Sequence, residues 1–270
     1  MTVATRITAL CALLLAVSPA RAAELSELAA AAKPGVVQLA IMDAAGEARG
    51  NGTGFFVSED GLIVTNHHVV KPAHSLRATL ADGGSRMVVG MLAFDEERDI
   101  AVIKVEGEDY PALPLGEDDE IKEGVEVLVL GSPLGLSWTL SEGIVAAIRE
   151  QGVPKELTGT TDKKGPLIQI TAPISPGSSG SPVLTTDGNV IGVAVMASVQ
   201  SAQNVNFAVP VSVVRQLLAG IPEGATPTPL GGGFPWINIV ISVVVVAAIV
   251  AALVLTGTRR RRPGRKRTQH

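Results

Sequence analysis

Aromatic residues are scarce in this chain of 270 residues. Phe, Trp and Tyr make up 3% of the sequence, whereas glycine and proline occur 29 and 17 times. Together with many Val and Ile residues, this composition is typical of short strands joined by turns rather than of long helices. It argues against a helical bundle and favours an all-β sandwich or barrel.

Cysteine is almost absent as well. The single copy, Cys11, lies in an apolar run from Ile7 to Val17 that follows Arg6 and precedes small residues ending at Ala22. These features predict a cleavable signal peptide over residues 1–22, with a retained N-terminal anchor as the alternative. After cleavage no disulfide is possible, and a domain of about 200 residues does not need one.

Basic residues are scarce in the middle of the chain. All 26 acidic residues lie between Glu24 and Glu223, whereas seven of the 22 basic residues follow Thr258. Without those seven, and without Arg6 and Arg21, 13 basic residues remain against 26 acidic ones, a net charge of −13. We therefore expect no nucleic-acid partner for this part of the chain.

One long apolar run lies near the C-terminus. Residues 237–255 contain only Asn238 and Ser242 as polar side chains. At about 1.5 Å per residue, a helix of this length spans about 28 Å, close to the thickness of a bilayer's hydrocarbon core. The pattern predicts a transmembrane helix over residues 236–256; a buried core helix and a processed C-terminal sorting signal are the alternatives.

The residues around this run predict its orientation. Seven basic residues follow it, so the positive-inside rule places a cytoplasmic tail at 257–270 and the preceding domain on the outer side of the membrane. Residues 220–235, rich in Gly and Pro, are predicted to be a flexible linker to the membrane.

Between the two ends, strand-like stretches recur every 8 to 15 residues, separated by turn signals such as Asp187-Gly188. Short helices are expected at 24–32 and 211–219. About a dozen strands suit two barrels of six, within one domain over residues 23–219 that divides near 116–124. The expected strands are 36–42, 54–57, 62–65, 76–80, 86–94, 101–105, 125–130, 139–148, 167–171, 183–184, 190–196 and 206–209.

Three segments carry residue types that amide hydrolysis requires, namely a nucleophile, a base and a group that orients the base. His68 follows a strand in Thr65-Asn66-His67-His68-Val69. Asp99 begins one in Asp99-Ile100-Ala101-Val102. Ser179 lies in the small-residue loop Gly177-Ser178-Ser179-Gly180.

These motifs, with Gly52-Thr53-Gly54-Phe55 ahead of them, resemble the HtrA/Deg family of trypsin-like serine proteases over about residues 34–219. The resemblance implies a double six-stranded β-barrel of trypsin type and a catalytic triad of His68, Asp99 and Ser179. It also implies an oxyanion hole built from the backbone N–H groups of Gly177 and Ser179, with help from Ser178. We prefer His68 to His67, Asp99 to Asp95, and Ser179 to Ser175, Ser178 and Ser181, because only the former occupy the motif positions.

The chain departs from the family pattern at two positions of the nucleophile loop. Ser178 stands where the family usually has Asn or Asp, and Ser181 where it usually has Gly, which puts the loop conformation in question. A carboxylate before the nucleophile is missing, so activation by pairing with a new N-terminus is excluded. After residue 219 the sequence passes to the linker, with no room for a PDZ domain before the apolar run.

By the same resemblance, Asn204, Val205, Asn206 and Phe207 should line the substrate pocket. No acidic residue occurs there to select Lys or Arg, so cleavage after small or medium aliphatic residues is expected. The predicted function is a membrane-anchored serine endopeptidase acting on unfolded or envelope polypeptides, with no cofactor or metal and possible homo-oligomers. The alternative is a catalytically silent pseudoprotease that binds peptides as a membrane scaffold.

Overall fold

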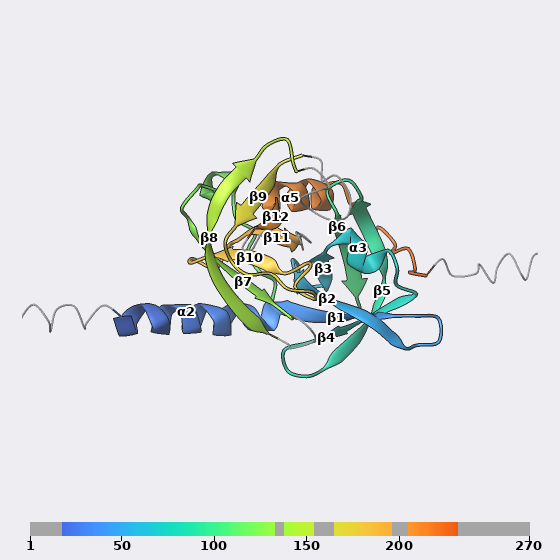
Figure 1. Cartoon of the computed structure of the whole chain (residues 1–270). Coiled ribbons are helices and arrows are strands. Elements are labelled where there is room, and N and C mark those ends of the chain that lie inside the picture. Colours follow the sequence, from blue (N-terminus) through green and yellow to red (C-terminus); the bar gives the residue numbers. More distant parts are fainter. Residues whose placement is uncertain (1–17, 133–137, 154–164, 196–204, 232–270) are drawn as a thin grey trace, which may run out of the picture. The chain divides into compact units, whose positions relative to one another are not determined.

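The structure is a computed structural model, and it describes residues 18–132, 138–153, 165–195 and 205–231 (Figure 1). Most of the expected signal peptide lies outside these ranges, as do the predicted transmembrane helix at 236–256 and the basic tail. Within the described residues, no helix has both the length and the apolar character needed to cross a membrane.

The first half of the chain forms a closed antiparallel barrel with the strand order β1-β2-β3-β6-β5-β4. Its interior is filled by apolar side chains that alternate along the strands, among them the fully buried Leu39, Phe56 and Ile103. The strands are β1 (Val36–Met42), β2 (Ala48–Phe56), β3 (Leu62–Thr65), β4 (Ser75–Thr79), β5 (Ser85–Asp95) and β6 (Ile100–Val105).

The second half forms another closed antiparallel barrel, ordered β10-β11-β12-β9-β8-β7. Val127, Ile168 and Val183 are fully buried in its interior. The strands are β7 (Glu126–Gly131), β8 (Thr139–Arg149), β9 (Leu167–Ile170), β10 (Pro182–Thr185), β11 (Val190–Val195) and β12 (Asn206–Pro210).

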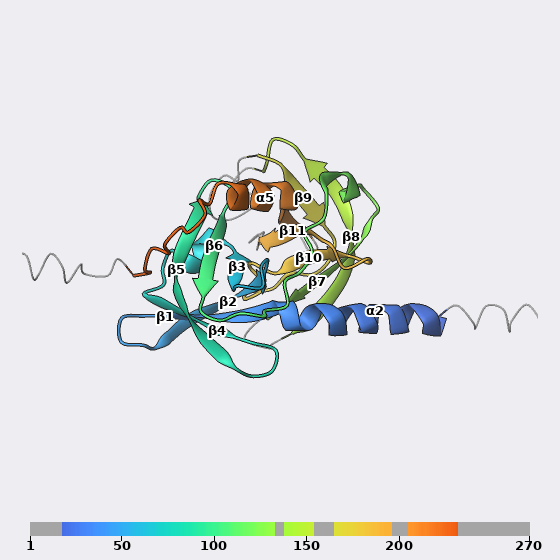
Figure 2. The same cartoon turned by 180° about the vertical axis from the view of Figure 1, so that it is seen from behind.

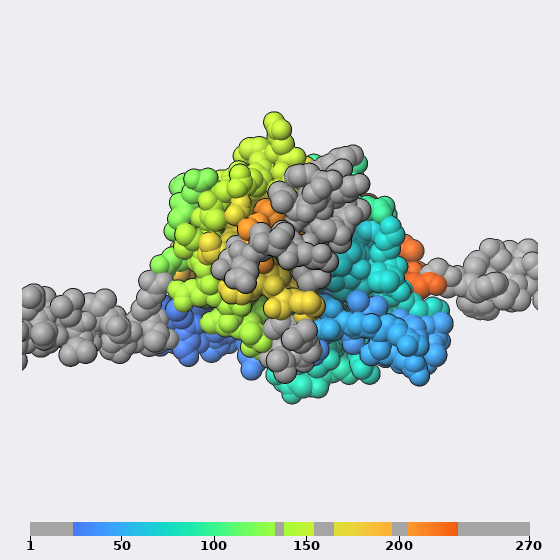
Figure 3. Space-filling view, in the orientation of Figure 1, coloured from blue at the N-terminus to red at the C-terminus, as the bar shows by residue number. Residues whose placement is uncertain are grey.

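A third apolar cluster joins the two barrels. Phe55 and Ile100 of the first barrel pack with Leu128, Leu184 and other residues of the second, and Figure 3 shows the two halves in contact, blue to teal beside green to yellow. This shared core allows side chains from different barrels to meet at one site.

Short helices complete the fold. They are α2 (Ser18–Ala32), the 3₁₀ turns η1 (Lys33–Gly35) and η2 (Asp118–Glu120), α3 (His67–Val70) and α5 (Val211–Ala219). The helix α5 contacts β5 and β6 of one barrel and β11 and β12 of the other, as the reverse view in Figure 2 shows. It therefore braces the two barrels against each other.

The predicted double six-stranded barrel and the helix at 211–219 are confirmed. The clearest difference is β2, which begins at Ala48 rather than at residue 54, because its Gly- and Asn-rich first half pairs with β1 through the backbone. The first helix begins at Ser18, inside the expected signal peptide, rather than at Glu24.

Part of the segment predicted as a flexible linker, residues 220–231, is described, and it contacts the first barrel. Thr228 forms an isolated antiparallel bridge with Met91 of β5, through two backbone hydrogen bonds of 2.8 Å. Leu230 packs against the first barrel's core, and Gly231 lies against the backbone of His74. Residues 220–231 are therefore attached to the first barrel by contacts with residues more than a hundred positions away, which local composition does not reveal.

Candidate active site

His68 lies on the single-turn helix α3, which begins directly after β3. The helix is anchored by its buried residues Val69 and Val70, while the side chain of His68 remains 47% exposed. An imidazole in this position is fixed at its backbone and open to solvent on one side.

Asp99 lies between β5 and β6 and faces His68. Its φ of 61° places it in the left-handed region, which is uncommon for a residue other than glycine, and its carbonyl accepts hydrogen bonds from Asn66 Nδ2 at 2.9 Å and His67 N at 3.2 Å. These bonds hold an unfavourable backbone conformation in place. The side chain, only 4% exposed, is thereby directed toward α3.

The carboxylate of Asp99 holds His68 at two points. Oδ1 accepts the backbone N–H of His68 at 2.8 Å, and Oδ2 lies 2.7 Å from His68 Nδ1. An ionised carboxylate can only accept hydrogen bonds, so Nδ1 carries the proton and Nε2 is left as the acceptor. The rival Asp95 is instead bonded to the backbone and guanidinium of Arg98.

The nucleophile loop is a tight turn before β10. Gly177 and Gly180 adopt φ of 97° and 88°, which glycine accommodates without strain. The N–H of Ser178 donates to Ser175 O at 2.9 Å, so it is occupied within the loop. Among the described residues the N–H groups of Gly177 and Ser179 donate to no acceptor, which leaves these two as the candidate oxyanion donors.

Ser181, one of the two departures from the family pattern, fits into the second barrel because of a glycine opposite it. Its side chain is fully buried and its Oγ lies where residue 131 would place a Cβ, 2.2 Å from the ideal position. Gly131 leaves that space open. The hydroxyls of Ser181 and Ser132 have no hydrogen-bond partner among the described residues.

The two halves of the predicted triad meet along β2. At Gly52, the position of a Cβ would lie 2.7 Å from the side chain of Val69, next to His68, and 3.4 Å from Ser179 O. Ser179 O in turn accepts the N–H of Thr53 at 2.9 Å. The described residues form no hydrogen bond between Ser179 Oγ and the His68 ring, a contact that in many proteases tightens only when substrate binds.

His67, the rival base, is buried beside the pair rather than part of it. Its ring stacks on Phe94 with centroids 4.7 Å apart. Burial is the largest cause that lowers the pKa of His67, and the nearby carboxylates of Glu96 and Asp99, which raise it, do not reverse the shift. The ring is therefore neutral near pH 7, and the carboxylate of Asp99 contacts the ring of His68, whereas the backbone N–H of His67 donates to the carbonyl of Asp99.

The predicted pocket residues lie in and before β12. Val205 is half-buried, and Asn206 is buried with its Nδ2 donating to Ala172 O at 2.9 Å. Phe207 packs in the core shared by the barrels, and Asn204 lies outside the described residues. The structure therefore shows how two of the four side chains are anchored and leaves their contact with substrate a prediction.

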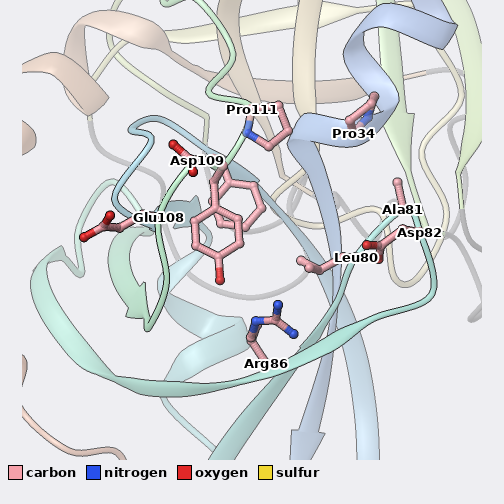
Figure 4. Close-up of a pocket in the computed structure, with 10 residues that line it drawn as sticks. Pro34, Leu80, Ala81, Asp82, Arg86, Glu108, Asp109 and Pro111 are labelled. Atoms are coloured by element: carbon pink, nitrogen blue, oxygen red, sulfur yellow. The ribbon is translucent and has the colours of Figure 1, made fainter.

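A cavity of about 260 Å³ opens on the first barrel and contains none of the predicted site residues (Figure 4). Its lining includes Phe56 and Tyr110, whose rings stack on each other, and the charged residues Asp82, Arg86, Glu108 and Asp109. In the part of the chain that the structure describes, no three His, Cys, Asp or Glu residues cluster as metal ligands would.

Thr53 is a residue of this region to which the sequence assigned no role. It is fully buried on β2, and its hydroxyl donates to Gly177 O in the nucleophile loop at 2.8 Å. In the motif Gly52-Thr53-Gly54-Phe55, the resemblance rests on the two glycines and Phe55. The sequence shows that this hydroxyl lies between two glycines of a strand. It does not show the hydrogen-bond partner, because Gly177 is 124 positions away.

Comparison with known proteins agrees with this fold. The family model of the trypsin-like peptidase domain matches residues 52–193. Proteins named "Probable periplasmic serine endoprotease DegP-like" are 37% identical over 201 residues in Hahella chejuensis and 34% identical over 200 residues in Pseudomonas fluorescens. Each match covers 73% of this chain, and the chain spans about 40% of the length of these relatives.

Solved structures agree in fold. The HtrA-type protease AlgW with a tripeptide superimposes with a TM-score of 0.64 at 28% identity, covering 74% of this chain and 64% of that one. The serine endoprotease from Yersinia pestis gives 0.62 at 25% identity, covering 74% and 67%. With its two barrels, its paired His68 and Asp99 and its matching family model, the chain belongs to the trypsin-like peptidases and resembles their DegP/HtrA-type members.

Proposed function

We propose that this protein is a serine endopeptidase that cleaves polypeptides with Ser179 as nucleophile, His68 as base and Asp99 as the group that orients the base. The observation that supports this most strongly is the two-point attachment of His68 to the buried carboxylate of Asp99. That attachment leaves Nε2 free to accept a proton, which is the tautomer that a serine nucleophile requires.

The acylation step uses both barrels. Ser179 Oγ attacks the substrate carbonyl carbon while its proton passes to His68 Nε2, and the resulting imidazolium is stabilised by Asp99. The negative charge on the carbonyl oxygen is met by the N–H groups of Gly177 and Ser179. Collapse of this intermediate breaks the C–N bond, and His68 returns the proton to the leaving amine.

Deacylation repeats the sequence with water. His68 takes a proton from a water molecule that attacks the acyl-enzyme, and the second intermediate collapses to release the new carboxyl terminus and to restore the hydroxyl of Ser179. The chain's own side chains and backbone supply each group in this scheme, so it requires no cofactor.

The proposed setting is the outer face of a bacterial inner membrane, with residues 236–256 as anchor and unfolded or envelope proteins as substrates. The apolar run, the basic cluster after it and the periplasmic names of the relatives support this proposal. Added protease should digest the domain in intact spheroplasts; protection of the domain would contradict the proposed orientation.

The proposed cleavage preference is for small or medium aliphatic residues. Peptide profiling that shows cleavage after Lys or Arg would contradict it.

The catalytic proposal is tested with the full-length chain purified in detergent. A fluorophosphonate probe should label it and casein should be degraded, whereas Ser179→Ala should abolish labelling and lower turnover by about a millionfold. Ser181→Ala is the matched control, because its buried hydroxyl is two residues away and has no described partner, and it should still be labelled. A wild-type chain that neither reacts nor cleaves would favour the peptide-binding scaffold instead.

A further inference from the structure

Thr53 belongs to the first barrel but contacts the catalytic loop of the second. It lies on β2, pairs with Gln38 of β1, and is fully buried in the interface between the barrels. Three hydrogen bonds of Thr53 cross that interface. Its N–H donates to Ser179 O at 2.9 Å, its hydroxyl donates to Gly177 O at 2.8 Å, and the same hydroxyl oxygen accepts the N–H of Ser132 at 3.0 Å.

A fourth hydrogen bond fixes Thr53 within its own barrel. The hydroxyl of Thr65, at the end of β3, donates to Thr53 O at 2.7 Å. Thr65 is also fully buried, so both threonines make their hydrogen bonds away from water. A buried hydroxyl with partners on both sides is held in one orientation, and losing it leaves those partners unsatisfied.

The glycines around Thr53 allow this close approach. A Cβ at residue 54 would lie 2.6 Å from the side chain of Ile63, and one at residue 180 would lie 2.1 Å from Thr53 O. Contacts this short require that both positions be glycine. The result is that the backbone of the nucleophile loop rests directly on the backbone of β2.

The bond from Thr53 acts on one particular peptide group of the loop. The peptide that joins Gly177 to Ser178 is held at both ends, since its carbonyl accepts from Thr53 Oγ1 and its N–H donates to Ser175 O at 2.9 Å. A peptide group is planar, so fixing both ends fixes its direction. The two candidate oxyanion donors, the N–H groups of Gly177 and Ser179, belong to the peptide groups on either side.

We propose that Thr53 is a positioning residue for the oxyanion hole: its hydroxyl, supplied by the first barrel, holds the Gly177–Ser178 peptide so that the N–H groups of Gly177 and Ser179 point at the substrate carbonyl. This inference rests on the proposed peptidase function. Without the hydroxyl, the peptide is held only from within its own loop and can rotate. Transition-state stabilisation then falls, while the nucleophile, the base and the substrate pocket remain in place.

The test compares hydroxyl-bearing and hydroxyl-free residues at position 53 in the full-length chain. Thr53→Val keeps the shape and removes the hydroxyl, and we expect kcat to fall about 10- to 100-fold, less than the roughly 100- to 1,000-fold loss of a whole oxyanion donor, with KM nearly unchanged. Thr53→Ser keeps the hydroxyl and should retain most of kcat. The affinity for a peptide aldehyde, whose adduct carries an oxyanion, should fall by the same factor as kcat/KM.

Thr185→Val is the matched control for the loss of a buried hydroxyl. Thr185 lies on β10, is 5% exposed, and accepts the N–H of Asn189 away from the triad. This variant should lower the melting temperature and leave kcat unchanged. If Thr53→Val behaves in the same way, with a lower melting temperature and an unchanged kcat, Thr53 has only a structural role and the proposal is overturned.

A second pair of variants covers the case in which Thr53→Val does not fold. Thr53→Ala and Thr53→Ser both lack the methyl group and differ only in the hydroxyl, so a kcat lower in Ala than in Ser supports the proposal and equal values overturn it. If only the serine variant folds, the hydroxyl serves folding, which also overturns it. A wild-type chain inert to fluorophosphonate refutes the peptidase function itself, whereas an active wild type with an equally active Thr53→Val refutes only the role of Thr53.

Discussion

The two barrels hold their catalytic groups in different ways. In the first, His68 and Asp99 fix each other directly, through bonds of 2.8 and 2.7 Å. In the second, the carbonyls of Gly177 and Ser179 are held from outside, by Thr53 of the first barrel. The base and its carboxylate are therefore arranged by one barrel alone, whereas the nucleophile loop depends on how the two barrels dock.

The largest effect in this comparison is expected from the pair within the first barrel. Asp99→Asn should lower kcat by about 10⁴-fold, because an amide can donate to Nδ1 and so favour the wrong tautomer of His68. Steady-state hydrolysis of a peptide substrate measures this. Asp95→Asn is the control, since Asp95 is bonded to Arg98, and it should change kcat little. Similar losses in both variants would contradict the assignment of Asp99.

A methyl group added at Gly180 should disrupt the packing of the nucleophile loop against β2. Gly180→Ala combines a φ of 88° with a Cβ only 2.1 Å from Thr53 O, so we expect a loss of more than about 4 kcal/mol in the free energy of unfolding. Gly83→Ala is the matched control, because Gly83 has a φ of 87° and nothing within 4 Å of its Cβ position. It should cost only about 1–2 kcal/mol, the penalty of the backbone conformation alone.

Denaturant unfolding of both glycine variants separates the cost of the steric clash with Thr53 from the cost of the backbone conformation. Equal losses at positions 83 and 180 would show that the close approach of the loop to β2 contributes nothing beyond backbone strain. That result would contradict the conclusion that the nucleophile loop depends on its packing against the first barrel.

The smallest effect concerns His67, next to the base. Burial lowers its pKa in the folded chain below the unfolded value of about 6.5, so the unfolded chain binds a proton first as the pH falls. The stability that the neutral ring contributes is present above about pH 6.5 and is lost as the pH falls from there toward the folded pKa. Burial is the largest cause of this shift, Lys71 and His68 also lower the pKa of the ring, and Glu96 and Asp99 raise it without reversing the direction.

His67→Phe tests whether His67 lowers the stability of the folded chain at acidic pH. The variant keeps an aromatic ring against Phe94. Melting temperatures measured between pH 7.5 and 5 should fall less in this variant than in the wild type. An equal fall in both would show that His67 does not contribute to the acid sensitivity of the first barrel.

Much of the fold could be predicted from local sequence. Alternating apolar residues and turn signals place the strands in the sequence, and the motifs around His68, Asp99 and Ser179 occur where the structure brings β2, α3 and the nucleophile loop together. The first half of β2 was missed because Gly50, Asn51 and Gly52 carry no apolar pattern. Its strand conformation comes from backbone pairing with β1.

The site residues that the sequence did not reveal depend on contacts between distant segments. Thr53 has an ordinary side chain in an ordinary strand, and only the docked barrels give its hydroxyl a partner in the nucleophile loop. The loop at Ser181 was in question for the same reason, since the space for that side chain comes from Gly131 on β7. Residues 220–231 looked flexible by composition, and the bridge from Thr228 to Met91 attaches them.

The bridge between Thr228 and Met91 determines which strand first bears a mechanical force applied to the C-terminal part of the chain. The chain continues beyond Gly231, and tension on this continuation meets Leu230 and the two backbone bonds between Thr228 and Met91 before it reaches α5. A pull on the C-terminal side is therefore borne first by β5, the strand that leads to Asp99, and by the segment after α3 that carries His74. Along the chain, Asp99 follows the end of β5 by four residues and His74 follows His68 by six, so these contacts lie nearer in sequence to the base and its carboxylate than to Ser179.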